Sequence, residues 1–583
     1  MKRYALWVMM LLVSVGGALV SLSAQPERSV FDEIKRAHQM LQRMPHLHPR
    51  AAGWTVDQPS LVVPQPINIS HYKIQLRLRP PTPLISGAVT IEGETVETIH
   101  SIHIDALSNL TIERVTFNGM PQSFERTSDK IRLNFSSSLP AAFEFTIVVS
   151  YSGRAVTGGV LGGGMLVARH NNFPVIGTLS QPYSAPSWWP CIDNPADKTT
   201  AEIEVNVPEG YVVASNGLLE ATQRQADRTV TYTWRERYPI ANYLIAVTTT
   251  NFVTFEDSYT ALDGTTMPLV YYVYPEHLTQ AQRKFPVTRR AMELFAPLFG
   301  EYPFLQEKYG MVEFPWSGAM EHQTLTSLGD IIVNFSDFVV QDFISHELAH
   351  QWWGNWVTMK TWNDIWLNEG FATYSEVLFF ERFLPVHPGE LMARSYGGAL
   401  VGTVYAENAA NPWDDPAAIY TKGAWVLHML RRVLGEERFF AALKDYGRRF
   451  AFGNASTADF QHVCEAHYGA SLQWFFEQWV YTPARPIYRA SYVVSPSSAQ
   501  GRYTVTLNIE QQQTHPIAGR VGEAAMVYIM PIDVTLYYAD GSSETRTVWN
   551  DARRQSFTLT ATQPVTRIGI DEQNWILKEL IQN

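Results

Sequence analysis

The stretch HELAHQWWGNWVTMKTWNDIWLNEGFATYSE, residues 346–376, places two histidines and several glutamates among large aromatic residues. Its first five residues put His346 and His350 four positions apart. On an α-helix, residues at this spacing share one face, so both imidazoles can point at a single ion about 2 Å from each nitrogen. Two interpretations are open: a buried helical hairpin that contains some polar residues, or a metal site built into a core.

The residues around the histidines favour the metal site. The segment FISHELAHQWWGNW, residues 343–356, is apolar nearly all round, which predicts a buried helix. Histidine and glutamate side chains inside a core are costly unless they are paired or bind a cation. A divalent ion removes that cost, so the buried hairpin alone is the weaker interpretation.

The neighbouring carboxylates complete a predicted catalytic zinc site. Glu347 follows the first histidine, which places it beside the open coordination position, where a general base acts. Eighteen residues separate the second histidine from Glu369, which leaves room for a loop and a second helix that runs back beside the first. Two histidines, one glutamate and a water are a catalytic rather than a structural zinc arrangement. Asp364 and Glu376 are candidate acceptors for the distal histidine N–H groups.

Chain length and charge limit the possible function classes. With 583 residues and a mass of 66.0 kDa, the chain is too long for one hydrophobic core. Its net charge of -11 and the lack of a basic stripe argue against nucleic-acid partners. Cys191 and Cys464 are the only cysteines, which excludes a disulfide scaffold and a cysteine metal site, and their spacing does not say whether they pair.

The N-terminus has the pattern of a secretory signal. Lys2 and Arg3 precede a long apolar run that ends in small residues, which predicts a signal peptide over residues 1–24. We therefore expect export to the periplasm or the extracellular space, with a membrane-anchored form as the alternative if the segment is not cleaved. An N-terminal segment, residues 25–59, follows; within it residues 31–48 predict a short amphipathic helix, and His46 and His48 are expected in a loop.

The hydrophobic period divides the rest of the chain into a multidomain β + α fold. Residues 60–255 alternate with period two, which predicts an antiparallel N-terminal β-sandwich, and the Gly-rich TGGVLGGGM at 157–165 is expected to be an irregular loop. Residues from about 280 to 482 have helical spacing and contain the metal motif, and the domain they form is predicted to cover residues 256–484. Residues 485–583 return to period two and predict a small C-terminal β-sandwich, with a hairpin turn at Asp540-Gly541.

Read together with WSGAMEHQT at 316–324, the metal motif resembles that of the aminopeptidase N and leukotriene hydrolase family of zinc peptidases. The family's G-x-M-E-N motif is matched by residues 318–322, except that His322 replaces the usual Asn. Similarity also extends through WWPCIDNPADK at 188–198 and YTKGAWVLHML at 420–430. The resemblance implies a thermolysin-like, mainly α catalytic domain that binds one zinc ion.

The resemblance also assigns roles to individual residues. Glu321 would hold the free α-amino group of a peptide substrate, and a carboxylate fixed near the metal suits that task. Tyr420 would donate a hydrogen bond to the oxyanion of the tetrahedral intermediate. The implied substrate-binding residues are Gln181, Gly318, Ala319, Met320 and Glu321, with Glu347 and Tyr420 catalytic and His346, His350 and Glu369 on the metal.

Two departures bear on how the substrate amine is held. Many relatives have a second carboxylate where Gln181 stands, and a neutral amide accepts from an ammonium with less attraction. The usual Arg after Ala185 is Pro186 here.

The predicted activity is removal of N-terminal residues from peptides with a free N-terminus, with Glu347 as general base. The alternatives are a related zinc endopeptidase, which would lack the amine anchor, an epoxide hydrolase, and a peptide-binding homologue without catalysis. Cleavage of free and N-acetylated peptides separates the first alternative from an aminopeptidase.

Overall fold

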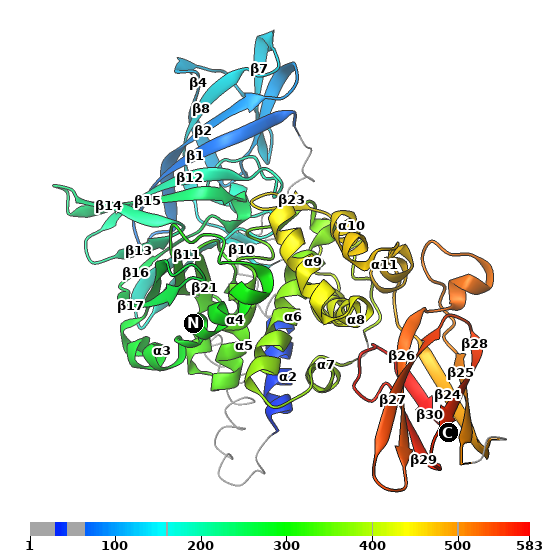
Figure 1. Cartoon of the computed structure of the whole chain (residues 1–583). Helices are drawn as coiled ribbons and strands as arrows, with labels where there is room; N and C mark the ends of the chain where they lie inside the picture. Colours follow the sequence, from blue (N-terminus) through cyan, green and yellow to red (C-terminus); the bar gives the residue numbers. More distant parts are fainter. Residues whose placement is uncertain (1–28, 44–64, 159–160, 399, 498–500, 583) are drawn as a thin grey trace, which may run out of the picture.

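The structure is a computed structural model that describes residues 29–43, 65–158, 161–398, 400–497 and 501–582. The order along these residues is β-rich, then mainly helical, then β-rich again (Figure 1), which confirms the predicted multidomain β + α fold. The predicted signal peptide, residues 1–24, lies outside the described residues. Among the described helices, none has the length and apolar character needed to cross a membrane.

The large N-terminal sheet has eight strands in the order β14-β15-β12-β1-β2-β8-β4-β5. Side chains of β1 alternate between buried and exposed as the period predicted. The prediction of a purely antiparallel arrangement was wrong, because β1 pairs with β12 in parallel. The two strands are far apart in sequence, so no tight hairpin forces them to run in opposite directions. The strands are β1 (Ile67–Leu78), β2 (Leu84–Thr95), β4 (Leu110–Phe117), β5 (Met120–Pro121), β8 (Glu144–Arg154), β12 (Thr199–Pro208), β14 (Leu218–Arg224) and β15 (Thr229–Ile240).

Two smaller sheets complete the N-terminal region. One has the order β3-β7-β6 and the other β13-β16-β11-β10-β9. Their strands are β3 (Ile99–Asp105), β6 (Glu125–Arg126), β7 (Lys130–Leu139), β9 (Thr157–Gly158), β10 (Gly163–His170), β11 (Phe173–Leu179), β13 (Val212–Ser215) and β16 (Val247–Thr250).

The Gly-rich segment is not simply the irregular loop that we predicted. Its two ends pair as antiparallel strands, β9 with β10. A Cβ at Gly164 would lie 2.2 Å from the carbonyl oxygen of Val156, so this close approach of backbones requires glycine.

A second five-stranded sheet, β17-β18-β19-β21-β20, carries the GAMEHQT motif at its edge. The predicted domain boundary between residues 255 and 256 falls inside β17, which pairs with β18 of this sheet. The strands are β17 (Val253–Thr260), β18 (Thr266–Val273), β19 (Tyr309–Phe314), β20 (Ala319–Met320) and β21 (Leu325–Gly329).

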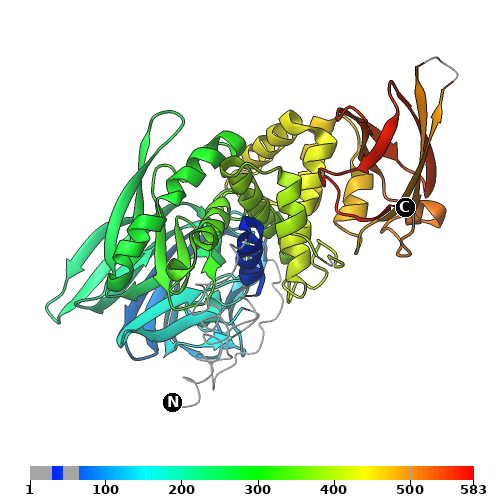
Figure 2. The same cartoon turned by 90° about the horizontal axis from the view of Figure 1, so that it is seen from below.

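Helices cover this sheet and form the middle of the molecule (Figures 1 and 2). The helix predicted within residues 31–48 is α2 (Val30–Arg43), which packs against α5 and α7. The other helices are α3 (Leu278–Lys284), α4 (Val287–Phe299), α5 (Asp337–Ala349), α6 (Trp366–Phe383), α7 (Pro388–Ser395), α8 (Gly423–Leu434), α9 (Glu436–Arg449), α10 (Thr457–Tyr468) and α11 (Gln473–Trp479).

The C-terminal region contains a four-stranded and a three-stranded sheet, β28-β25-β24-β30 and β27-β26-β29. Gly541, in the predicted hairpin turn between β26 and β27, has a φ of 84°, which confirms the turn. The strands are β24 (Ile487–Pro496), β25 (Tyr503–Gln511), β26 (Met530–Tyr538), β27 (Ser543–Asn550), β28 (Arg554–Ala561), β29 (Val565–Ile570) and β30 (Glu579–Gln582).

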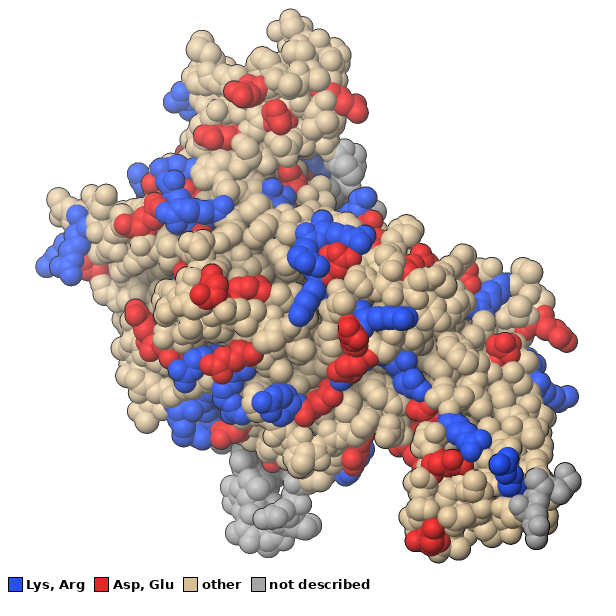
Figure 3. Space-filling model, in the orientation of Figure 1, with Lys and Arg blue, Asp and Glu red and all other residues tan. Residues whose placement is uncertain are grey.

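Two surface and core features agree with the composition. On the face shown in Figure 3, basic side chains are interspersed with acidic ones and form no continuous stripe. Cys191 and Cys464 are both buried and unpaired with each other.

Candidate metal centre and active site

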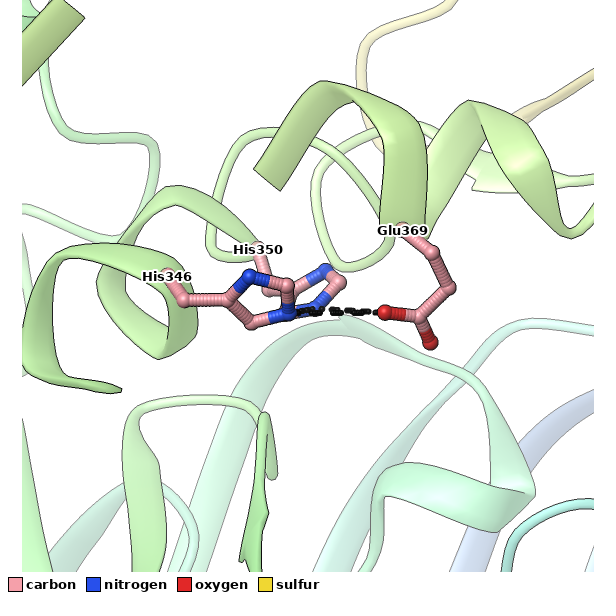
Figure 4. Close-up of side chains that lie close together, drawn as sticks. All are labelled: His346, His350 and Glu369. Atoms are coloured by element: carbon pink, nitrogen blue, oxygen red, sulfur yellow. Dashed lines mark hydrogen bonds and ion pairs between the residues drawn. The ribbon is translucent and has the colours of Figure 1, made fainter. Parts of the chain in front are cut away.

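The three predicted metal ligands come together between α5 and α6 (Figure 4). His346 lies in the last turn of α5, His350 caps its C-terminus, and Glu369 lies in the first turn of α6. The chain reverses between the helices at Gly354, whose φ is 128°. A Cβ there would lie 3.0 Å from the Asn368 side chain, so glycine permits both the turn and the close packing of the helices.

The ligand atoms have the spacing of a tetrahedral site. His346 Nε2 and His350 Nε2 are 3.1 Å apart, and each is 3.4 Å from Glu369 Oε2. A tetrahedral ion with ligands at about 2.0–2.1 Å needs edges of about 3.3–3.4 Å. All three side chains are buried, so the arrangement is held by the core around it.

Hydrogen bonds at the far side of each ring leave the Nε2 atoms free to bind a cation. The Nδ1–H of His346 donates to Glu376 Oε1 at 2.6 Å, and the Nδ1–H of His350 donates to the carbonyl oxygen of Trp353 at 2.9 Å. In neutral imidazoles the facing Nε2 atoms therefore carry lone pairs, which repel each other unless a cation lies between them. The residues present fit a zinc ion.

One of the two candidate supporting carboxylates lies elsewhere. Asp364 accepts hydrogen bonds from the backbone and hydroxyl of Thr457 and so supports α10. Both residues are carboxylates close to Glu369 in sequence, but Asp364 ends the short helix η6 (Trp362–Asp364) that precedes α6, whereas Glu376 lies on α6 itself.

Glu347 lies beside the ligand group and has the environment of a proton carrier. Its side chain is only 3% exposed, and within the described residues its Oε2 has no hydrogen-bond partner. Burial raises the pKa of Glu347 to about 8, although His346 and His350 act in the opposite direction. A bound cation would lower the pKa of Glu347, as the two histidines do, and so would favour its charged form.

Glu321 faces the same site from the sheet. It follows β20, is 3% exposed, and its Oε1 accepts from Gln181 Nε2 at 3.2 Å. Burial raises the pKa of Glu321, and Glu369 acts in the same direction while His350 opposes it. Within the described residues no ion pair is formed by this carboxylate, so an incoming ammonium group would stabilise its charge.

Tyr420 reaches the site from a π-helical turn, η7 (Ala417–Lys422). Its ring stacks on His346 with centroids 5.9 Å apart, and its hydroxyl accepts from Trp413 Nε1 at 3.3 Å. The hydroxyl proton is thus available to another acceptor. Such π-turns often occur at functional sites because they re-aim side chains.

A glycine pair sets the distance between Tyr420 and the metal ligands. A Cβ added to Gly370 would lie 2.9 Å from the Cα of Gly423. The helix that carries Glu369 therefore crosses the start of α8 in direct backbone contact, which brings η7 close to the ligands.

The three candidate metal ligands line one small cavity together with Glu321, Glu347 and Tyr420. Its volume is about 30 Å³, enough for a water molecule. Most of the cavity wall is made of predicted site residues. Three apolar residues that were not predicted, Leu161, Trp316 and Phe343, also line it. Phe343 lies three residues before His346, so helical spacing was a signal for it, whereas nothing local indicated Leu161. Met320 is buried but does not line the cavity. The predicted residues on the cavity wall are Gln181, Gly318, Ala319, Glu321, His346, Glu347, His350, Glu369 and Tyr420.

The departures from the family pattern have local explanations. His322 is buried and its Nδ1 lies 2.7 Å from Ser327 Oγ, so it is held away from the cavity. Burial lowers the pKa of His322 to about 3. Pro186 lies in the short helix η2 (Ala185–Ser187), and its carbonyl oxygen accepts from Leu107 N.

Family models match both the N-terminal and the helical part of the chain. The Peptidase family M1 domain matches residues 283–479, and the Peptidase M1 N-terminal domain matches residues 68–244. Together the two matched segments span more than half of the 583 residues.

Individual relatives agree with this match. The leucyl aminopeptidase of Saccharolobus solfataricus is 26% identical over 468 residues, which are 76% of this chain and 57% of that protein. The aminopeptidase N of Lactococcus lactis subsp. lactis is 27% identical over 454 residues, 73% of this chain and 52% of that protein. The chain spans about half the length of the curated relatives it matches.

Solved structures establish the fold. The M1 zinc metallopeptidase of Deinococcus radiodurans, in a variant bound to a Tyr-Ser-Ala substrate, has a TM-score of 0.62 at 24% identity, covering 71% of this chain and 94% of that chain. The aminopeptidase A of Legionella pneumophila, in complex with aspartic acid, has a TM-score of 0.76 at 18% identity, covering 90% of this chain and 61% of that chain.

Proposed function

Because this chain belongs to peptidase family M1, we propose that it is a zinc-dependent aminopeptidase that removes N-terminal residues from peptides. One observation supports this most directly: the Glu321 carboxylate lines the same small cavity as the three candidate ligand atoms. An acid at that place can bind an α-ammonium group while the first peptide bond lies at the metal.

His346, His350 and Glu369 would hold the zinc ion. When bound, zinc would act as a Lewis acid on the scissile carbonyl and lower the pKa of a bound water. Glu376 fixes the tautomer of His346, and the Trp353 carbonyl does the same for His350.

The remaining steps fall to side chains of the chain itself. Glu347 takes the proton of the attacking water on its unpartnered Oε2 and returns it to the leaving amine. Tyr420 turns its hydroxyl proton toward the oxyanion of the tetrahedral intermediate. Glu321, together with the amide oxygen of Gln181, accepts from the substrate ammonium and fixes how deep the peptide enters.

The test compares an aminoacyl chromogenic substrate with its N-acetylated counterpart, using zinc-loaded protein and the Glu347→Gln variant. The proposal expects cleavage of the free amine only, and near-complete loss in the variant at unchanged zinc content. Equal cleavage of both substrates would instead favour an endopeptidase.

We also propose that the chain is exported, with residues 1–24 removed as a signal peptide. The charged start followed by an apolar run supports this. Mass spectrometry of protein from the producing cells should find a mature N-terminus near residue 25, and an intact N-terminus would refute cleavage.

A further inference from the structure

Helix α2 lies beside the helices that carry the metal ligands, although it precedes the whole N-terminal β-rich region in sequence (Figure 2). It packs against α5 and α7. Ile34, Ala37 and His38 form its fully buried side, while Lys35 faces solvent. Apolar helix faces commonly dock in this way, but a histidine at the centre of the buried side needs polar partners.

Contacts at the start of α2 hold it in one place. Ser336 Oγ, just before α5, donates to Glu33 at 2.9 Å. The guanidinium of Arg394, on α7, lies 3.7 Å from the centre of the Phe31 ring. The first contact fixes the helix against the same α5 whose last turn carries His346, and the second fixes it against α7.

His38 connects two parts of the active site. Its Nε2 lies 2.8 Å from the hydroxyl of Thr421, the residue that follows Tyr420 in η7. Its Nδ1 lies 3.4 Å from Glu376 Oε2. The tautomer with a proton on Nδ1 can donate toward the carboxylate and accept from the threonine hydroxyl, so both ring nitrogens face a polar partner.

Glu376 is the carboxylate that orients the metal ligand His346. Its Oε1 accepts from His346 Nδ1, and its Oε2 accepts from the hydroxyl of Tyr396 at 2.9 Å as well as facing His38. Glu376 is fully buried, so its two oxygens depend on these neighbouring donors for their hydrogen bonds.

We propose that His38 is a positioning residue, by which α2 completes the support of the zinc site: it fixes Glu376 behind His346 and fixes η7 behind Tyr420. The proposal rests on the proposed zinc site and goes beyond it, because the helix lies outside both matched family segments. The physical reason is that a ligand imidazole keeps its orientation and basicity only as well as its carboxylate partner is held.

The experiment measures the zinc dissociation constant by chelator competition, together with kcat and KM, in full-length protein. His38→Ala and His38→Leu both remove the donor, and the second keeps the core filled if the first does not fold. Both variants should weaken zinc binding about tenfold, the lower end for losses of supporting groups around a metal. They should also lower kcat more than they raise KM.

Two further variants separate positioning from simple packing. His38→Asn keeps a hydrogen-bond donor near Glu376. It should therefore restore zinc affinity to within about threefold of wild type, because its side-chain amide can replace the contact between His38 and the Glu376 carboxylate. In a Glu376→Gln background, His38→Ala should weaken zinc binding by less than about twofold further, because residues acting through one partner are not additive. Lys35→Ala, on the exposed side of α2, is the matched control and should leave the zinc dissociation constant, kcat and KM unchanged.

Wild-type zinc affinity in both His38→Ala and His38→Leu would overturn the proposal. The proposal would also be overturned if His38→Ala weakened zinc binding by the same factor in the wild-type and the Glu376→Gln backgrounds. If the wild type binds zinc but cleaves no free-amine substrate, the proposed activity fails while the zinc-affinity comparison still decides the role of His38.

Discussion

Replacing Glu321 by Gln tests whether this carboxylate makes the site an exopeptidase. The change keeps the side-chain volume and removes only the charge. In the structure Glu321 is 3% exposed and Gln181 lies 3.2 Å away, so after substitution a substrate ammonium would meet two neutral amides. A hydrogen bond to a charged group contributes about 1.5–3 kcal/mol. We therefore expect kcat/KM for a free aminoacyl substrate to fall by about 10- to 150-fold.

The assay measures kcat/KM for a chromogenic aminoacyl substrate and for its N-acetylated form, with zinc content determined in each sample. The loss should be confined to the free amine, so that the preference over the acetylated substrate shrinks by the same factor. Glu313→Gln is the matched control, because Glu313 is also buried but forms a hydrogen bond with His277 and does not line the cavity. Equal losses on both substrates, or no loss on either, would refute the role of Glu321 in binding the amine.

The remaining predictions concern catalysis, packing and pH. Glu347→Gln should lower kcat by about 10²–10⁴-fold with zinc content unchanged, as measured by activity assays and metal analysis. Loss of zinc from the variant would contradict the role of Glu347 as a general base. Tyr420→Phe should lower kcat about 100-fold or more with little change in KM, so a rise in KM alone would argue against an oxyanion donor. Gly370→Ala should lower the free energy of unfolding by about 1–3 kcal/mol and reduce kcat, since its Cβ would lie 2.9 Å from a backbone atom of α8; denaturant melts at wild-type stability would disprove the close contact. Burial lowers the pKa of His428 to about 3, so between pH 6.5 and 3 the unfolded chain binds a proton that the folded chain does not. Stability should therefore fall as pH falls through this window, by up to about 1.4 kcal/mol per pH unit, and His428→Gln should flatten that slope in unfolding measurements at several pH values.

Local sequence patterns determined the parts of this protein that depend on neighbours along the chain. The spacing of His346 and His350 placed both rings on one helix face, and the alternation of residues 67–78 defined a strand with one buried side. Helix and strand periods are properties of a few consecutive residues, so they can be read without the fold. The β-α-β order of the chain followed from the same periods.

Only the tertiary structure decided the contacts between distant segments. Gln181 meets Glu321, Gly370 touches Gly423, β1 pairs in parallel with β12, and His38 reaches Glu376 from a helix near the N-terminus. Each pair is joined by packing of the whole molecule, and many other partners would satisfy the same local pattern. The sequence alone therefore determined which residues could bind a metal, and the fold determined what holds them and how close a substrate can come, because burial and distance depend on every element that packs around the site.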